Sequence, residues 1–334
     1  MFYNTAYGAW AKYDAMCLDK YRRKGKVEQF LSEFSIAKDK NEVAFLIGNG
    51  FNRYACRNGA KSWDELIESL TVTCSYDIFE CNHLDTTEQY SAIVLAKGEE
   101  EVMTRLVDIN QKDLECTDRV KELNVALRKI NIPVLTTNID DLIDCDPTTG
   151  KAYPTYDFAY DGGKIDNPRE ILHDSLWTLN HYFAPQELKS ADSGYGVWHI
   201  HGHSSHQDTI RFGLVSYAKL IARLSHRLDT ISDDNWLLKN TWMNLLMKKR
   251  LCIVGLNISR VEFSLRYFLL RRCHIFKEIF GCPSPGGWYL YTKKEESDLE
   301  PVLQFVKSVG IVPVPFDDYD PIYNTIVKIS KDCE

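Results

Sequence analysis

Short apolar runs that end abruptly in glycine or polar residues recur along the chain. A run without alternating polar positions is typical of a parallel strand that is buried on both faces. Segments of helical periodicity separate these runs, so the pattern predicts an α/β, Rossmann-like fold with a mostly parallel sheet and helices on both faces. The expected core strands are residues 43–48, 132–137, 197–201, 251–255, 287–292 and 311–316.

The segments between these runs show helical periodicity, and some carry capping signals. The amphipathic stretch VEQFLSEFSI, residues 27–36, predicts a helix within a largely helical first forty residues. The order Ser62-Trp63-Asp64-Glu65 is a capping-box pattern, and helical apolar spacing then continues to about residue 130. We therefore expect a helical insertion lobe over about 60–130. Further helices are predicted over residues 234–250 and 261–272.

Residues 147–196 break this regular alternation. They are rich in proline, glycine, aspartate and tyrosine, which favour turns over continuous elements. We expect an irregular insertion lobe without sheet, with a helical piece at 169–179. A short strand is predicted at 210–214. Because we find no internal repeat, we expect a single domain over residues 1–334.

Composition and charge narrow the classes of function. The 334 residues are 44% hydrophobic and 26% charged, as in ordinary soluble globular proteins. The net charge of −7 argues against nucleic acid as the main ligand, and the only dense basic cluster, residues 20–26, is typical of a solvated face. We find neither a signal-peptide pattern nor an apolar run of membrane-spanning length. The ten cysteines include no C-x-x-C pair, so we expect a cytoplasmic protein with free thiols, no membrane attachment and no direct nucleic-acid contact.

Glycine-containing turns follow two of the predicted strands. After the first strand, Gly48 and Gly50 flank Asn49 in a turn that lets backbone N–H groups approach a pyrophosphate. A plain tight turn has the same pattern. After the strand at 251–255, Gly255 precedes Asn257, an arrangement that fits an adenosine ribose or a loop without a ligand.

A second group of polar residues follows the strand at 132–137. Ligands in open α/β folds bind beyond the carboxyl ends of the strands, which is where Thr137, Asn138 and Asp140 lie. Asn138 or Asp140 could equally cap the amino terminus of a helix. Both interpretations remain open at the level of the motif alone.

Four of the nine histidines lie within VWHIHGHSSH, residues 197–206. On an extended strand His199, His201 and His203 would share one face, and such a set can bind a metal ion. No second cluster of aspartate, glutamate or histidine stands out to complete a metal site. The alternative is a single catalytic base with histidine neighbours.

The motifs are more specific as a set than any one of them is alone. They are GNGFNR (48–53), SWDEL (62–66), TTNIDD (136–141), HIHG (199–202) and IVGLNIS (253–259), in this order. The set resembles the sirtuin fold over about residues 43–320, and most resembles the bacterial sirtuin-like NAD hydrolases of antiphage defence. Sirtuin deacylases also carry a small zinc lobe with two cysteine pairs. This sequence lacks that lobe, which puts protein deacylation in doubt.

The resemblance implies roles for individual residues. The catalytic pair would be His201, which directly precedes a glycine, and Asn138, which would orient a water molecule. Asn52 stands where the family usually has serine or threonine. The residues that the resemblance assigns to NAD binding are Gly48, Asn49, Gly50, Asn52, Thr137, Asp140, Gly255 and Asn257.

What the resemblance implies about function is cleavage of NAD to nicotinamide and ADP-ribose, with depletion of NAD during abortive infection. NAD would be the substrate, and no metal would be required. We expect a homo-oligomer of low activity, gated by self-assembly or by a separately encoded ATPase or sensor protein. The alternatives are an NAD-dependent protein deacylase, a non-catalytic nucleotide sensor, and a metal-dependent hydrolase that uses the HIHGH cluster.

Overall fold

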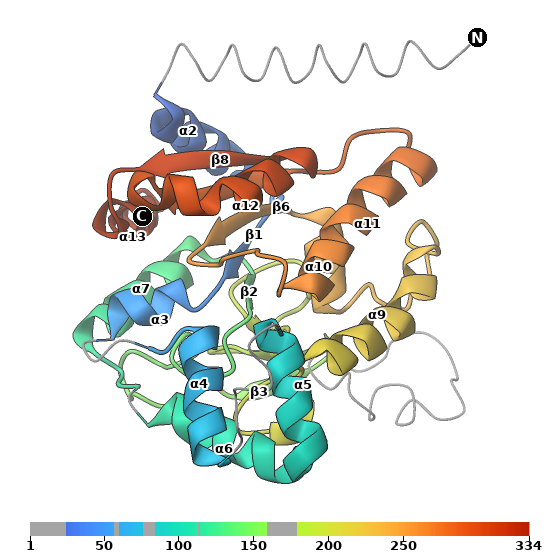
Figure 1. The fold of residues 1–334 in the computed structure, drawn as a ribbon. Coiled ribbons are helices and arrows are strands. Elements are labelled where there is room, and N and C mark those ends of the chain that lie inside the picture. The colour runs from blue at the N-terminus through green and yellow to red at the C-terminus, as the bar shows by residue number, and fades with distance from the viewer. Residues whose placement is uncertain (1–24, 57–59, 76–83, 113, 159–178, 334) are drawn as a thin grey trace.

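The computed structural model describes residues 25–56, 60–75, 84–112, 114–158 and 179–333. Within these ranges the chain forms an eight-stranded sheet with the strand order β3-β4-β5-β2-β1-β6-β7-β8 (Figure 1). The strands are β1 (Val43–Ile47), β2 (Val134–Thr136), β3 (Thr155–Asp157), β4 (His181–Phe183), β5 (Val197–His199), β6 (Arg250–Val254), β7 (Gly287–Thr292) and β8 (Ile311–Phe316).

Six of these strands are parallel and form a continuous block that runs from β5 to the edge strand β8. From β1 the chain builds outward through β2 to β5, and it then returns to the other side of β1 to add β6, β7 and β8. This order, β5-β2-β1-β6-β7-β8, is that of doubly wound dinucleotide-binding folds. The switch point lies between β1 and β6, because strands are added on one side of β1 first and on its other side afterwards. All six predicted core strands are confirmed, each within two residues of the expected bounds.

Helices cover both faces of the sheet, as predicted (Figure 1). Alternate residues of β1 point to opposite faces, so that Phe45 packs in one core and Leu46 in the other. The first face is covered by α2 (Lys26–Asp39), α3 (Gly50–Ala55), α7 (Asp118–Ile130) and α13 (Tyr319–Lys331). The second face is covered by α9 (Leu214–Leu228), α10 (Trp242–Lys248), α11 (Phe263–Ile279) and α12 (Glu296–Ser308). The short 3-10 helices are η3 (Gln207–Thr209) and η4 (Lys293–Glu295).

The predicted helical insertion forms a lobe with its own apolar core. It contains α4 (Trp63–Thr73), α5 (Thr86–Lys97) and α6 (Glu99–Gln111). The capping box is confirmed: the Ser62 hydroxyl accepts from the Glu65 N–H at 3.2 Å, and the Glu65 carboxylate accepts from the Ser62 N–H at 2.6 Å. The core of the lobe also includes Ile139, Ile210, Phe212 and Tyr217, which come from or lie close to the loops that follow β2 and β5. The lobe therefore packs directly on these two loops.

The expectation of a lobe without sheet over 147–196 is corrected, because β3 and β4 lie in this segment and extend the sheet beyond β5. They pair antiparallel with one another, and Phe183 of β4 pairs antiparallel with Val197 of β5. Aromatic packing holds this edge, with the Tyr182 and Trp198 ring centroids 5.1 Å apart. The turn-rich composition masked strands that are only three residues long.

Two other local predictions are also corrected. Residues 210–214 do not form a strand, because Gly213 adopts a φ of +86° and α9 begins at Leu214. The helix predicted over 234–250 covers only α10, since the Thr241 hydroxyl accepts from the Met243 N–H and caps the helix there.

Some predictions fall outside the described ranges. These are the helical prediction for residues 1–24 and most of the predicted helical piece at 169–179. The amphipathic helix predicted at 27–36 is confirmed as part of α2. Within the described residues, no helix combines the length and the apolar character needed to cross a bilayer.

The turns after β1 and β6 touch backbone to backbone, which leaves no room for a side chain. A Cβ at Gly50 would lie 2.6 Å from Gly255 Cα, and a Cβ at Gly48 would lie 2.7 Å from Leu256 Cα. The Gly50 N–H donates to the Gly255 carbonyl at 2.7 Å. Close packing of the strand ends is therefore a sufficient reason for both glycines.

We predict that Gly50→Ala destabilises the protein by about 1–3 kcal/mol, the usual cost of forcing extra atoms into a packed site. Gly25→Ala is the control, because a Cβ there would lie 3.8 Å from the nearest atom and the exchange costs at most about 1 kcal/mol at a helix N-cap. Urea denaturation would compare the free energies of unfolding. Equal losses in the two variants would contradict the backbone contact.

Candidate active site

The candidate site lies where the carboxyl ends of β1, β2, β5 and β6 meet in the centre of the sheet. Thr136 of β2 pairs with Ile47 of β1 on one side and with His199 of β5 on the other. The loops that follow these strands therefore begin side by side. The Thr137 N–H donates to the Ile47 carbonyl at 3.1 Å, which ties the loop after β2 to the end of β1.

A buried chain of hydrogen bonds joins three of the predicted site residues. The Asn138 amide Nδ2 donates to Asn52 Oδ1 at 3.2 Å, and Asn52 Nδ2 donates to Asp140 Oδ2 at 2.6 Å. Asp140 Oδ1 accepts from the Leu142 N–H at 3.1 Å. Burial raises the pKa of Asp140 to about 6, although these hydrogen bonds favour its charged form. Asp140 thus uses both oxygens to anchor the loop and to orient Asn52.

The Asn138 side chain has one polar atom that no described residue binds. Its Oδ1 is buried and has no hydrogen-bond partner among the described residues, whereas its Nδ2 is bound to Asn52. A buried acceptor without a partner is costly, so such atoms mark candidate ligand contacts. Asn138 lines a cavity of about 10 Å³ together with Asn49 and Asp140. This volume is about that of one water molecule.

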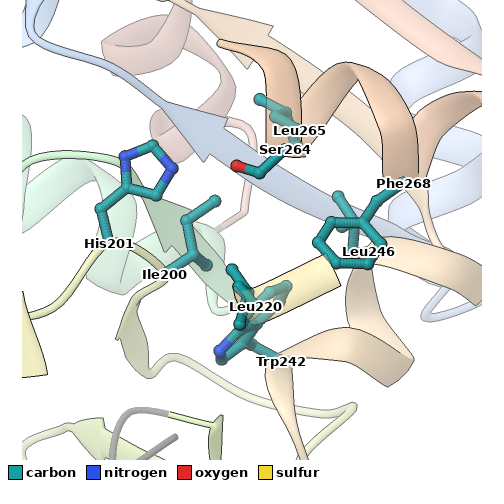
Figure 2. Close-up of a pocket in the computed structure, with 8 residues that line it drawn as sticks. All are labelled: Ile200, His201, Leu220, Trp242, Leu246, Ser264, Leu265 and Phe268. Atoms are coloured by element: carbon teal, nitrogen blue, oxygen red, sulfur yellow. The ribbon is translucent and has the colours of Figure 1, made fainter. Parts of the chain in front are cut away.

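His201 lies in the turn that follows β5, two residues beyond the end of the strand. Gly202 has a φ of +93°, and a Cβ there would lie 2.4 Å from Ile210 Cα, so a glycine is required directly after this histidine. The His201 side chain is buried, and its Nδ1 has no hydrogen-bond partner among the described residues. His201 borders a second cavity of about 10 Å³, whose other lining residues are apolar except for Ser264 (Figure 2).

Burial lowers the pKa of His201 to about 4, so its imidazole is neutral at pH 7. A general base usually has a pKa nearer the working pH. The cause of this shift is the burial of His201 itself. The ionisable group beside it, Glu262, is also buried, and burial raises the pKa of this carboxyl group to about 8. His201 Nε2 and Glu262 Oε2 are 3.8 Å apart. At pH 7 both groups are therefore uncharged, and their separation is longer than a hydrogen bond.

Glu262 was not predicted from the sequence. It directly precedes α11, and its Oε2 is buried without a hydrogen-bond partner in the described structure. The sequence feature that could have indicated Glu262 is its place as an acidic residue between a strand-end glycine turn and an amphipathic helix. Only the folding of β6 and β5 into one sheet shows that this residue faces His201.

The three alternating histidines do not share one face, which corrects the sequence expectation. The strand ends at His199, and the turn at Gly202 brings His203 back against His199, with ring centroids 4.6 Å apart. Asp144 faces both rings: its Oδ1 lies 3.2 Å from His199 Nε2, and its Oδ2 lies 3.9 Å from His203 Nε2. Within the described chain, these three residues are the only set of histidine, cysteine, aspartate or glutamate close enough to share a metal ion.

The electrostatics of the two rings differ. Burial by itself would lower the pKa of His199, but Asp144 raises it above its usual value. His203 has no such compensation, and burial lowers its pKa to about 2. His199 Nδ1 donates to the Asn138 carbonyl at 2.7 Å, so this cluster also supports the backbone of the loop after β2.

The remaining predicted residues are placed as follows. Asn49 Nδ2 donates to the Lys61 carbonyl, and Thr137 is buried at the end of β2. Gly255 adopts a φ of +60° against Gly50, and Asn257 is exposed. Asn138 and His201 border separate cavities in this conformation.

The comparisons with protein families and with curated proteins found no match: no protein-family model matches this sequence, and no curated protein matches it significantly. The assignment of a family and of an activity therefore depends on the motifs and on the geometry of the site.

We predict that Glu262→Gln stabilises the protein above about pH 8. The folded state holds the Glu262 proton up to a pKa of about 8, whereas the ordinary value is 4.5. The stabilising contribution is therefore complete below about pH 4.5, declines between the two pKa values and is lost above about pH 8. Glutamine keeps the shape and carries no charge, so the melting temperature of the variant should exceed that of wild type by several degrees at about pH 9.

Thermal melts from about pH 5 to pH 9 would test this. Glu278→Gln is the matched control, because Glu278 lies on the same helix and its side chain is 55% exposed. If wild type and Glu262→Gln keep the same difference in melting temperature at every pH, Glu262 does not hold a proton in the folded state.

Proposed function

We propose that this protein is a sirtuin-like NAD glycohydrolase, which cleaves NAD to nicotinamide and ADP-ribose. The observation that carries the proposal is the position of Asn138, a buried amide with an unpartnered oxygen beyond the carboxyl end of β2. It lies in a sheet whose strand order is that of dinucleotide-binding folds. His201 follows the neighbouring strand β5, as the resemblance to sirtuin-like hydrolases requires.

The proposed reaction breaks the bond between the ribose C1′ and the nicotinamide nitrogen. Nicotinamide departs as a neutral molecule from a cationic pyridinium, and the ribose passes through an oxocarbenium-like state. Asn138 Oδ1 accepts a hydrogen bond from the attacking water or from a ribose hydroxyl, while Asn52 holds the other end of the amide. The water oxygen bonds to C1′, and its proton passes to neutral His201. Attack on an oxocarbenium ion needs little basicity, so a pKa of about 4 is compatible with this role.

The site is too small for the substrate in this conformation, and residues of the helical lobe line the cavity beside Asn138. The cavities beside Asn138 and His201 each measure about 10 Å³, far below the several hundred Å³ of a typical ligand pocket. The helical lobe packs on the loops of the site through Ile139, Ile210 and Phe212. We infer that the protein by itself is held closed, and that self-association or a separate partner protein shifts the lobe. A restrained NAD hydrolase of this kind fits a role in antiphage abortive infection.

The alternative activities have less support. A metal-dependent hydrolase needs a metal that a substrate can reach, whereas the side chains of Asp144, His199 and His203 are 0% exposed and border neither cavity. No feature of the described residues favours a binding site for acylated lysine over one for NAD alone.

We predict that His201→Ala lowers the rate of NAD cleavage by roughly two to four orders of magnitude, the usual contribution of a positioned acid–base group. Asn138→Ala should cause a loss of similar size, because the water or the ribose loses its positioning group. The control is His274→Ala, since the His274 side chain is 57% exposed on α11. Nicotinamide release would be measured by chromatography, with a thermal melt of each variant. Full activity in a folded His201→Ala protein would exclude the proposed mechanism.

We also predict that the specific activity increases with protein concentration. If self-association opens the lobe, the rate of NAD cleavage per chain should rise as dimers or larger assemblies form. Light scattering combined with the same assay would follow mass and activity over a dilution series. A monomer that is fully active at every concentration would contradict the closed state.

A further inference from the structure

We propose that Asp144, His199 and His203 bind a zinc ion, and that this ion fastens the loop after β2 to the loop after β5. The three side chains are fully buried, and none of them has a role in the proposed NAD hydrolysis. The inference therefore does not depend on that activity. From the sequence we expected no metal, and the alternative of a metal at the HIHGH cluster included His201 in place of Asp144.

The two ring nitrogens of His199 both face oxygen atoms. Its Nδ1 lies 2.7 Å from the Asn138 carbonyl oxygen, which can only accept, so Nδ1 carries a proton and donates it. In a neutral ring Nε2 then holds a lone pair. This nitrogen faces Asp144 Oδ1 at 3.2 Å, so two acceptors confront one another. Either a proton, carried by His199 or by Asp144, or a metal ion must therefore lie between them.

The contact between Asp144 and His203 also lacks a hydrogen bond. Asp144 Oδ2 and His203 Nε2 are buried, face one another at 3.9 Å, and have no hydrogen-bond partner in the described part of the chain. With a second proton on His199, the other two atoms are a donor (His203 Nε2, because Ser205 donates to its Nδ1) and an acceptor that are too far apart to bond. A metal ion among the three side chains would satisfy them together with His199 Nε2. The metal therefore accounts for more of the cluster than the proton does.

The geometry and the donor types favour zinc. Two ligand atoms about 2.0–2.1 Å from a tetrahedral zinc ion lie about 3.3 Å apart. The 3.2 Å between His199 and Asp144 matches this separation, whereas His203, at 3.9 Å from Asp144, must move closer to bind the ion. Asp144 presents one oxygen to each ring, so a bidentate carboxylate and two imidazoles supply four donor atoms. The bond from His199 Nδ1 to a backbone carbonyl is the kind of support that orients metal-binding histidines.

Metal binding by His203 requires one local change. The Ser205 N–H donates to His203 Nδ1 at 3.2 Å, which places the proton of a neutral ring on Nε2. Coordination through Nε2 moves this proton to Nδ1 and releases the Ser205 N–H. Because Ser205 is exposed, water can take over that hydrogen bond, so the change costs little.

The position of the cluster indicates what the ion does. Asp144 belongs to the loop after β2, which also carries Asn138, whereas His203 belongs to the loop after β5, which also carries His201. A zinc ion here would hold the two proposed catalytic loops at a fixed separation without touching the substrate. We therefore assign it a structural role.

The test is the metal content of untagged protein purified from cells grown with added zinc. Elemental analysis should find about one zinc per chain in wild type and in His206→Gln. The latter is a matched control, because the His206 ring is 6.5 Å from His203 and outside the three-residue set. His203→Gln and Asp144→Asn each remove a ligand, so their zinc content should fall at least tenfold.

A second measurement decides the question even if these variants fail to fold. Wild-type protein freed of zinc by a chelator should bind one equivalent of Co²⁺ with the intense visible absorption of tetrahedral coordination, and its melting temperature should rise by several degrees. Folded wild type without zinc, and without this absorption when Co²⁺ is added, would overturn the proposal in favour of a His199–Asp144 ion pair. Equal zinc content in wild type and a folded His203→Gln variant would also overturn it. Both measurements are independent of NAD cleavage.

Discussion

The centre of this molecule depends on one close contact, that of the glycine turn after β1 with the turn after β6. Gly50 approaches Gly255 so closely that neither position tolerates a side chain, and a backbone hydrogen bond of 2.7 Å joins them. The contact lies where the chain changes its winding direction, at the position where doubly wound folds bind dinucleotides. It also sets the start of α3, from which Asn52 reaches the loop after β2.

From this centre outward, buried polar groups determine how the strand-end loops are held. Asn52 satisfies Asp140 and orients Asn138, and His199 supports the backbone of the same loop. An uncompensated polar group inside a protein costs more than a hydrogen bond returns, so each of these contacts restricts the loop strongly. Asn138 Oδ1 and His201 Nδ1 are buried polar atoms that have no hydrogen-bond partner within the described structure. The two residues follow the neighbouring strands β2 and β5, which is the physical basis for proposing a reaction at this edge of the sheet.

The helical lobe packs on the loops that carry the proposed catalytic residues. Its apolar core includes Ile139 and Ile210, so a shift of α4, α5 and α6 would move the residues that adjoin Asn138 and Gly202. The cavity beside Asn138 is lined in part by Trp63 and Leu66 of α4, and its water-sized volume is what a closed lobe would leave. A fixed pair of loops under a movable lobe would let the protein keep its proposed catalytic geometry while access to it changes.

The sequence by itself determined the six parallel strands, the capping box of α4 and the glycine and polar residues at the strand ends. These features follow from local patterns, because a strand buried on both faces and a helix N-cap leave their signatures within a few residues. Only the tertiary structure showed that β3 and β4 extend the sheet, that His203 rather than His201 adjoins His199, and that Glu262 faces His201. Asp144 and Glu262 reach their histidines across more than fifty residues of chain, and a single turn at Gly202 reverses the direction of the histidine segment. Such pairings depend on which strands become neighbours and on where a strand stops, and no periodicity within the segment encodes either.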